Sequence, residues 1–268
     1  MLYFVVLRTS IAERLVYRVD FALGTLMRFL PIVTQIFLWQ AVFAGMQSTN
    51  KSVAGYTMDN MIAYYLLTMV GRAFSSMPGL AGGIARDIRD GTIKKYLLQP
   101  VDMLTFLLMT RVAHKLVYYA VAIFPFALVF WLCGRYFSGW PDAATMAAFI
   151  ASLVMGFLLG FFIEATLGMI GFWFLEVNSL LFVFMLASFF FSGQMFPPEM
   201  MPRPWPAILK AIPLQYLAYF PASVFLHKIS GPELQRALAV EALWVVFFFL
   251  AARTLFYVGV KRYSAFGG

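Results

Sequence analysis

The residues that could do chemistry gather in one glycine-bounded stretch, which runs GGIARDIRDGTIKKYLLQP over positions 82–100. Its acidic residues are Asp87 and Asp90. Basic residues stand around them, namely Arg86, Arg89, Lys94 and Lys95. Neighbouring carboxylates could hold a hard cation such as Mg²⁺, whereas alternating charges could bind a charged surface of another protein. The remaining alternative is a solvated loop that does neither.

Outside this stretch, the sequence contains few residues that could bind a nucleotide or a metal ion. A phosphate-binding loop needs the pattern GxxxxGK[ST], but Gly91 is followed by Thr92 without a Lys-Ser or Lys-Thr pair. His114 and His227 are isolated, and the single cysteine, Cys133, can form neither an intramolecular disulfide nor a metal cluster. We therefore expect no cofactor, ATP or metal ion to be held by this chain.

Two of the charged residues within apolar segments are candidates for function, because a charge there is costly unless it faces protein or water. They are Arg28 and Glu164, and glycines surround Glu164 at positions 156, 160, 168 and 171. The two charges could line a translocation path, or they could form a pair or hydrogen bond that only fixes packing. We favour packing, because glycines four residues apart let helices approach closely.

The elements that must position these residues belong in a membrane. The chain of 268 residues is 62% hydrophobic and 12% charged, against about 25% charged residues in an average soluble domain. Six segments reach the ~20 mainly apolar residues that a spanning helix needs. They are 21–46, 57–80, 103–133, 144–173, 177–196 and 234–259. The sequence thus predicts an all-α membrane protein with six transmembrane helices, folded as a single domain over 1–268.

The distribution of lysine and arginine predicts the orientation. With the N-terminus inside, nine of them fall in cytoplasmic segments and six in outer segments. Residues 1–20 mix arginines with apolar residues and are expected to form a helix at the inner interface. We expect both termini in the cytoplasm and the protein in the inner (plasma) membrane. The net charge of +8 does not indicate nucleic-acid binding, because the basic residues do not gather on one solvated face.

Two connections between the predicted spans are longer than a turn. The cytoplasmic one is 82–102. The outer one, 192–232, is divided by eight prolines into apolar pieces too short to span, such as 207–212 and 214–225. We expect these pieces to form a re-entrant or surface-lying pair of half-helices. Such pieces can lie within the hydrocarbon region of a membrane only where protein or water covers their free backbone groups.

The cytoplasmic connection resembles the first cytoplasmic loop of type-2 ATP-binding-cassette (ABC) exporter permeases. In that family an acidic residue, usually Glu, comes four positions before a glycine, and two leucines and a proline follow. Asp87, Gly91, Leu97, Leu98 and Pro100 occupy these places, with Asp where the family usually has Glu.

The outer connection is similar to the family's segment between the fifth and sixth spans. It contains SGQMFP at positions 192–197, which includes Gly193 and Pro197, and then Trp205, Pro213 and Pro221. The resemblance covers nearly the whole chain, including the N-terminal interface helix and the layout of six spans.

What the resemblance implies is a transport subunit, not an enzyme. Two permease chains, identical or related, would pair among membrane lipids and work with two separate ABC ATPase subunits, which would hold the ATP and Mg. Residues 82–102 would form a coupling helix on an ATPase, and nucleotide-driven movement of this loop would open the path outward. The expected contact residues are Arg86, Asp87, Arg89, Asp90, Gly91 and Lys94. The expected re-entrant element includes Gly193, Pro197 and Pro213.

Two other classes of function fit the sequence less well. A CDP-alcohol phosphatidyltransferase shares part of the pattern at Asp87, Asp90 and Gly91. That family also needs Ala-Arg after the glycine and two more aspartates on the next helix, where this chain has Arg111 and Lys115. An ion-coupled secondary transporter would show broken helices in both halves, and only the region near the fifth span is broken. The exporter therefore fits best. Its substrate is expected to be amphipathic or lipid-like, because 18% of the residues are aromatic.

Overall fold

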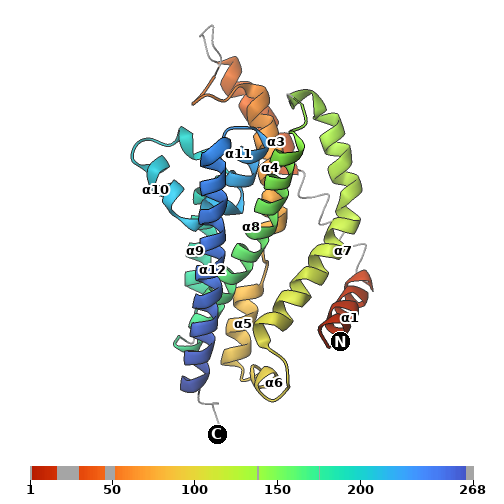
Figure 1. Cartoon of the computed structure of the whole chain (residues 1–268), viewed down its shortest axis with the longest axis vertical. Helices are drawn as coiled ribbons and strands as arrows, with labels where there is room; N and C mark the ends of the chain where they lie inside the picture. Colours follow the sequence, from red (N-terminus) through yellow and green to blue (C-terminus); the bar gives the residue numbers. More distant parts are fainter. Residues whose placement is uncertain (1, 17–29, 46–51, 138, 175, 264–268) are drawn as a thin grey trace.

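The computed structural model describes residues 2–16, 30–45, 52–137, 139–174 and 176–263. Within these ranges the regular elements are helices, which gather into an elongated bundle (Figure 1). The short helix α6 (Lys94–Leu97) and the C-terminal end of α12 (Gly231–Arg262) lie toward one end, which we call the α6 end. The opposite end, which carries α10 (Trp205–Ala211), is called the α10 end.

Helices occupy all six segments that the sequence predicted as spans. Three are long and apolar enough to cross a membrane: α7 (Met103–Leu132), α8 (Ala143–Met169) with its extension η2 (Ile170–Phe172), and α12. The remaining three are α3 (Leu30–Ala44), α4 (Met58–Ser75) and α9 (Asn178–Phe191). Helices α3 and α9 are apolar but have only 15 and 14 residues, so the complete six-span topology stays a prediction.

Polar caps decide where several of these helices begin. The N-cap residues Thr57, Asp102 and Asp142 use side-chain oxygens to accept hydrogen bonds from backbone N–H groups in the first turns of α4, α7 and α8. Such a cap satisfies donors that the helix itself leaves free. The long apolar helices therefore start at polar residues of the connections.

Helix α8 is the centre of the bundle, and α4, α5 (Leu80–Arg89), α11 (Tyr219–Phe225) and α12 pack against it. Its glycines allow this approach. A Cβ atom at Gly160 would overlap the carbonyl oxygen of Ser75, and one at Gly168 would lie 2.8 Å from the carbonyl oxygen of Ala81. The predicted close packing along this face is confirmed, because only a residue without a side chain fits there.

The N-terminal region forms α1 (Leu2–Val16), which packs against α7 (Figure 1). The expected interface helix, 1–20, is thus helical in its described part, with Arg8 exposed. Residues 17–20 lie outside the described residues, as does Arg28. Whether α1 rests on a membrane surface stays a prediction.

The predicted cytoplasmic connection, 82–102, begins inside α5, continues through α6 and ends at the N-cap of α7. Helix α5 is amphipathic: Leu80, Ile84 and Ile88 are buried against the bundle, whereas Arg86 and Arg89 are exposed. Gly91 separates α5 from α6 with a φ of +73°, a conformation that glycine adopts without steric cost.

The predicted outer connection, 192–232, folds into four short pieces. They are η3 (Pro198–Met200), α10, η4 (Pro213–Leu217) and α11. The first apolar piece expected from the sequence corresponds to α10, and the second is divided into η4 and α11. All residues from 215 to 225 are buried, and α11 packs against α4 and α8. Protein thus covers this backbone, as a re-entrant element requires, while its depth in a membrane stays a prediction.

Candidate functional site

A cavity of about 870 Å³ lies in the bundle, and α3, α4, α5, α7, α8 and α9 all contribute to its wall. A volume of this size falls in the range of small-molecule sites. Its apolar lining includes Phe126, Leu181, Phe184, Met185 and Phe189. Its polar lining includes Gln35, Thr68, Arg72, Ser76, Tyr118, Glu164, Ser188 and Gln194. The cavity therefore combines an apolar wall with a few hydrogen-bonding groups.

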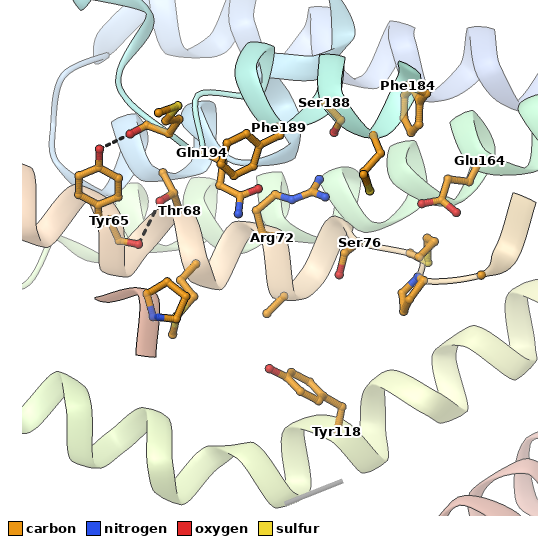
Figure 2. Close-up of a pocket in the computed structure, with 18 of the residues that line it drawn as sticks. Tyr65, Thr68, Arg72, Ser76, Tyr118, Glu164, Phe184, Ser188, Phe189 and Gln194 are labelled. Carbon is orange, nitrogen blue, oxygen red and sulfur yellow. Dashed lines mark hydrogen bonds between the residues drawn. The ribbon is translucent and has the colours of Figure 1, made fainter. Parts of the chain in front are cut away.

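Arg72 stands in the last turn of α4, and its guanidinium points into the space between α4 and α9 (Figure 2). Its Nη1 donates a hydrogen bond to Oγ of Ser75 over 3.4 Å. Charged groups within membrane helices are rare and usually face a protein interior or a water-filled path. Arg72 was not singled out in the sequence analysis, although its place in the apolar segment 57–80 was a usable signal.

Glu164 also lines the cavity, on α8 (Figure 2). Its carboxylate interacts with the backbone N–H groups of Met77 and Ala81 and with the charges of Arg72 and Arg111. Ala81 belongs to the first turn of α5, where free N–H groups and the helix dipole favour an anion. Glu164 thus holds the start of α5 against α8. Of the two interpretations offered for Glu164, the structure shows packing contacts and a cavity lining at once.

Two basic residues of α7 hold the chain between α4 and α5. Nζ of Lys115 donates hydrogen bonds to the carbonyl oxygens of Ala73 and Ser76, the latter over 2.8 Å, and Arg111 donates to the carbonyl oxygen of Pro78 over 2.9 Å. Cations are favourable at a helix C-terminus, where carbonyl groups lack partners within the helix. These two basic residues consequently stand beside this end of the cavity, where they stabilise the junction of α4 and α5.

The predicted coupling residues are arranged by local pairs on α5 and α6. Oδ1 of Asp87 accepts a hydrogen bond from Thr92 over 2.7 Å, and Oδ2 pairs with Lys95 over 2.9 Å, while Arg89 pairs with Asp90 over 3.1 Å. Burial opposes the charge on Lys95, but the hydrogen bond to Asp87 and the attraction of Asp87 and Tyr96 together outweigh it and raise the pKa of this ammonium group. Lys94 and Arg86 are exposed. The partner of Asp87 on α6 is therefore Lys95, which was not among the expected contact residues.

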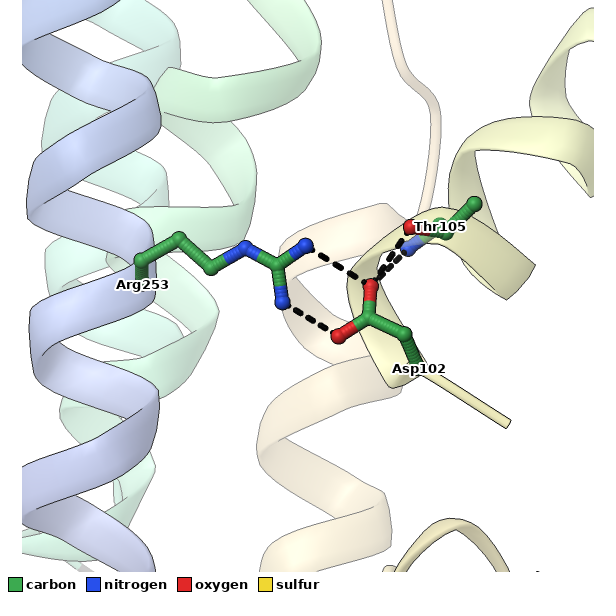
Figure 3. A network of polar contacts seen from close by, with 3 residues as sticks. All are labelled: Asp102, Thr105 and Arg253. Carbon is green, nitrogen blue, oxygen red and sulfur yellow. Dashed lines mark hydrogen bonds and ion pairs between the residues drawn. The ribbon is translucent and has the colours of Figure 1, made fainter. Parts of the chain in front are cut away.

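An ion pair that the sequence did not reveal joins α7 to α12 beside this region (Figure 3). Arg253 donates to both carboxylate oxygens of Asp102, with Nη2 to Oδ2 at 3.0 Å, and Thr105 donates to Oδ2 through its backbone N–H over 2.8 Å and its hydroxyl over 2.6 Å. Partial burial alone would raise the pKa of Asp102, but the bonds from Arg253 and Thr105 hold it below its ordinary value. The pair fixes where α7 starts relative to α12.

A second carboxyl group missed by sequence analysis is Glu241 of α12. It is completely buried, and Oγ of Ser152 on α8 donates to its Oε1 over 3.3 Å. Its signal in the sequence was a single acidic residue within the apolar segment 234–259. It does not line the cavity described above, so we assign it to the contact between α8 and α12.

The residues expected in the re-entrant element serve packing at the α10 end. The carbonyl oxygen of Gly193 accepts a hydrogen bond from the hydroxyl of Tyr64. A Cβ atom at Gly193 would lie 2.6 Å from that of Tyr219, and its φ is +78°. Pro197 is buried, and Pro213 begins η4. These residues lie apart from the coupling residues, so the two predicted sites are separate.

Metal chemistry gains no support from the carboxylates near α5. Asp87 and Asp90 are paired with Lys95 and Arg89, which offer positive charge where a cation would need further ligands. In the ranges that the structure describes, no three His, Cys, Asp or Glu residues are grouped so that they could hold a metal ion. The phosphatidyltransferase interpretation is therefore not supported.

Comparison with known proteins agrees with the helical cavity and the apolar helices around it. A family model described as ABC-2 family transporter protein matches residues 29–267. No curated protein that was compared matches the chain. The match covers nearly the whole sequence, including α5, the cavity and the connection between α9 and α12. This chain belongs to the ABC-2 family of membrane transporter proteins.

Proposed function

We propose that this chain is the permease subunit of an ATP-driven exporter, which moves an amphipathic or lipid-like substrate out of the cytoplasm. The ATP and Mg would be held by two separate ATPase subunits, and a second permease chain, identical or related, would complete the transporter. The proposal builds on membership of the transporter family and on one structural observation, the continuity between the charged surface of α5 and the cavity.

That continuity runs along a single helix. Ala81 and Gly82, in the first turn of α5, line the cavity, while Arg86 and Arg89, one to two turns later, are exposed. Because α5 has ten residues and is held at its start by Glu164, a push on its exposed end is transmitted as movement of a rigid element. A partner that binds the arginine side would therefore change the shape of the cavity.

The proposed orientation puts the α6 end in the cytoplasm. In the structure α1, α5, α6 and the last turn of α12 lie toward this end (Figure 1), and the last turn of α12 carries Lys261 and Arg262. Positive charge on the cytoplasmic side is the usual rule for membrane helices. The α10 end would then face outward, and the substrate would leave there.

A charge-reversal experiment tests this function. The chain is expressed together with its neighbouring genes, and the amount of ATPase that co-purifies is measured for wild type and for a variant with Arg86→Glu and Arg89→Glu. We expect the double variant to lose most of the bound ATPase, because both side chains are exposed and would contact the partner directly.

The matched control is Lys210→Glu, which reverses an exposed charge on α10 and should leave the bound ATPase unchanged. If Lys210→Glu lost as much bound ATPase as the double variant, the loss in the double variant would be explained by general destabilisation of the permease. If wild type retains no ATPase, or if the double variant retains as much as wild type, the proposed coupling surface is wrong.

A further inference from the structure

The cavity offers two different kinds of surface to one ligand. On α9, Phe184, Met185 and Phe189 present apolar side chains, and Phe126 of α7 adds to this wall. Figure 2 shows Arg72 with its guanidinium directed toward the side of the cavity where Ser188 and Glu164 lie. A ligand that fills this space would meet a cation and an apolar wall together.

Arg72 has donor capacity left for such a ligand. A guanidinium carries five N–H groups in a planar fork that matches carboxylate and phosphate oxygens. In the described part of the chain it makes one hydrogen bond, to Oγ of Ser75, at the long distance of 3.4 Å. Arg72 is only partly exposed; a cation with unused donors in such a place is costly, and an anionic ligand would remove that cost.

Glu164 does not already serve as this anion. Its carboxylate lies near the backbone N–H groups of Met77 and Ala81 and near Arg111 as well as Arg72. In the described part of the chain no ion pair within 4.0 Å joins it to Arg72. Glu164 therefore leaves donors of Arg72 available on the side of α9.

Basic side chains also lie near the junction of α4 and α5, beside this end of the cavity. Arg111 and Lys115 of α7 donate hydrogen bonds there to backbone carbonyl oxygens. Among the described residues that line the cavity, Arg72 is the cation and Glu164 is the carboxylate. A low-dielectric surrounding strengthens the field of Arg72, which favours an anionic group and disfavours a cationic one.

We propose that the cavity binds an amphipathic substrate through an anionic headgroup, a carboxylate or phosphate held by Arg72, with its apolar part against α9. This inference rests on the proposed transport function and narrows its substrate class. Arg72 is the specificity-determining residue, and the aromatic wall accepts chains of varied length because it offers no directional contacts.

The first test compares headgroups on one chain length. The permease with its ATPase is placed in nanodiscs of phosphatidylcholine, and binding of radiolabelled dodecyl phosphate is measured, with empty nanodiscs as background. We expect saturable binding that unlabelled dodecyl phosphate displaces and that dodecyltrimethylammonium at equal concentration does not. Absence of saturable binding, or equal displacement by the ammonium compound, would overturn the proposal.

Two further competitors identify the source of the anion. Nanodiscs that contain phosphatidylglycerol will compete if the natural ligand is a lipid headgroup, and inorganic phosphate will compete if a free anion suffices. Displacement by either supports recognition of an anionic headgroup. Displacement by neither, together with displacement by dodecyl maltoside, would show that only the apolar chain is bound and would contradict the role of Arg72.

The second test changes the cation. Arg72→Gln should weaken binding of dodecyl phosphate roughly tenfold or more, as expected for loss of a charge-assisted hydrogen bond. Arg72→Lys keeps the charge and should bind with intermediate affinity, while the exposed control Lys210→Gln should bind as wild type. A gel-filtration profile and a thermal stability equal to those of wild type show which variants are folded, and if Arg72→Gln is not, Arg72→Lys decides. Wild-type affinity in a folded Arg72→Gln variant would overturn the proposal.

The two proposals fail in different ways. If no ATPase co-purifies with the wild-type chain but dodecyl phosphate binding still depends on Arg72, the exporter function is wrong and the anion site stands. If the ATPase co-purifies and binding is indifferent to headgroup charge, the exporter function stands and the substrate class is wrong.

Discussion

The connections at the two ends of the bundle differ in where their polar groups point. On α5 and α6 the charged side chains face outward and pair locally, as Arg89 does with Asp90, whose side chains are 47% and 48% exposed. At the α10 end polar groups point inward: Tyr64 donates to the carbonyl oxygen of Gly193, and Tyr65 donates to that of Met195. Exposed pairs contribute little to stability, whereas buried hydrogen bonds are costly to break. The charged groups of the first connection are therefore accessible, whereas the polar groups of the second hold the bundle together.

The largest effect is expected at Gly193. A Cβ atom there would lie 2.6 Å from that of Tyr219, at a φ of +78°, so Gly193→Val combines overlap with backbone strain. We expect a loss of about 3 kcal/mol or more in the free energy of unfolding, measured by tryptophan fluorescence during denaturation in detergent.

The control for that substitution lies in the other connection. Gly83 of α5 has no atom within 4 Å of an added Cβ, so Gly83→Ala should stabilise its helix by about 0.5–1 kcal/mol. If both substitutions were equally destabilising, the difference drawn between the two connections would be wrong.

A smaller effect is expected when only the hydroxyl of Tyr64 is removed. Tyr64→Phe leaves the ring in place but deprives the carbonyl oxygen of Gly193 of a donor in a buried place. The expected loss is about 1–3 kcal/mol in the free energy of unfolding. The control is Tyr257→Phe, on an exposed face of α12, which should change the free energy of unfolding by less than about 0.5 kcal/mol. If Tyr257→Phe were as destabilising as Tyr64→Phe, the effect at Tyr64 could not be attributed to its buried hydrogen bond.

The smallest effect is expected for the ion pair of Asp102 and Arg253 near the α6 end. Both side chains are partly exposed, at 31% and 39%, so a double-mutant cycle with Asp102→Asn and Arg253→Gln should give a coupling of about 0.5–1 kcal/mol. The side-chain oxygen of an asparagine at position 102 can still accept the hydrogen bonds from Thr105, so the start of α7 stays intact.

The same pair predicts a direction of pH dependence. Because the pKa of Asp102 is lower in the folded protein than its ordinary value, its contribution is fully present above that ordinary value, about 3.9. It is lost as the pH falls through the folded pKa. Unfolding measured between pH 3 and 7 should therefore show a steeper acid loss in wild type than in Asp102→Asn, and identical curves would argue against the pair.

Local sequence was enough to predict most of the helices. The lengths of the apolar stretches predicted the six helical segments, and the glycines near Glu164 indicated close packing along α8. The division of 214–225 into η4 and α11 was not predicted, because the break at Ala218, with φ −150° and ψ −54°, has no proline or glycine to mark it. The partner of Asp87 was also not predicted, since the turn at Gly91 brings Lys95 rather than Lys94 onto it.

The sequence by itself determined that this chain belongs in a membrane, where its main helices lie along the chain, and which charged stretch becomes α5 and α6. These features could be predicted because hydropathy and charge patterns depend on residues that are close together in the sequence. Only the tertiary structure decided that Arg72 of α4 would share a cavity with the apolar face of α9, that Glu164 would hold the start of α5, and that Asp102 would meet Arg253, 151 positions away. Such contacts depend on how helices pack in space, and no local pattern encodes which faces meet.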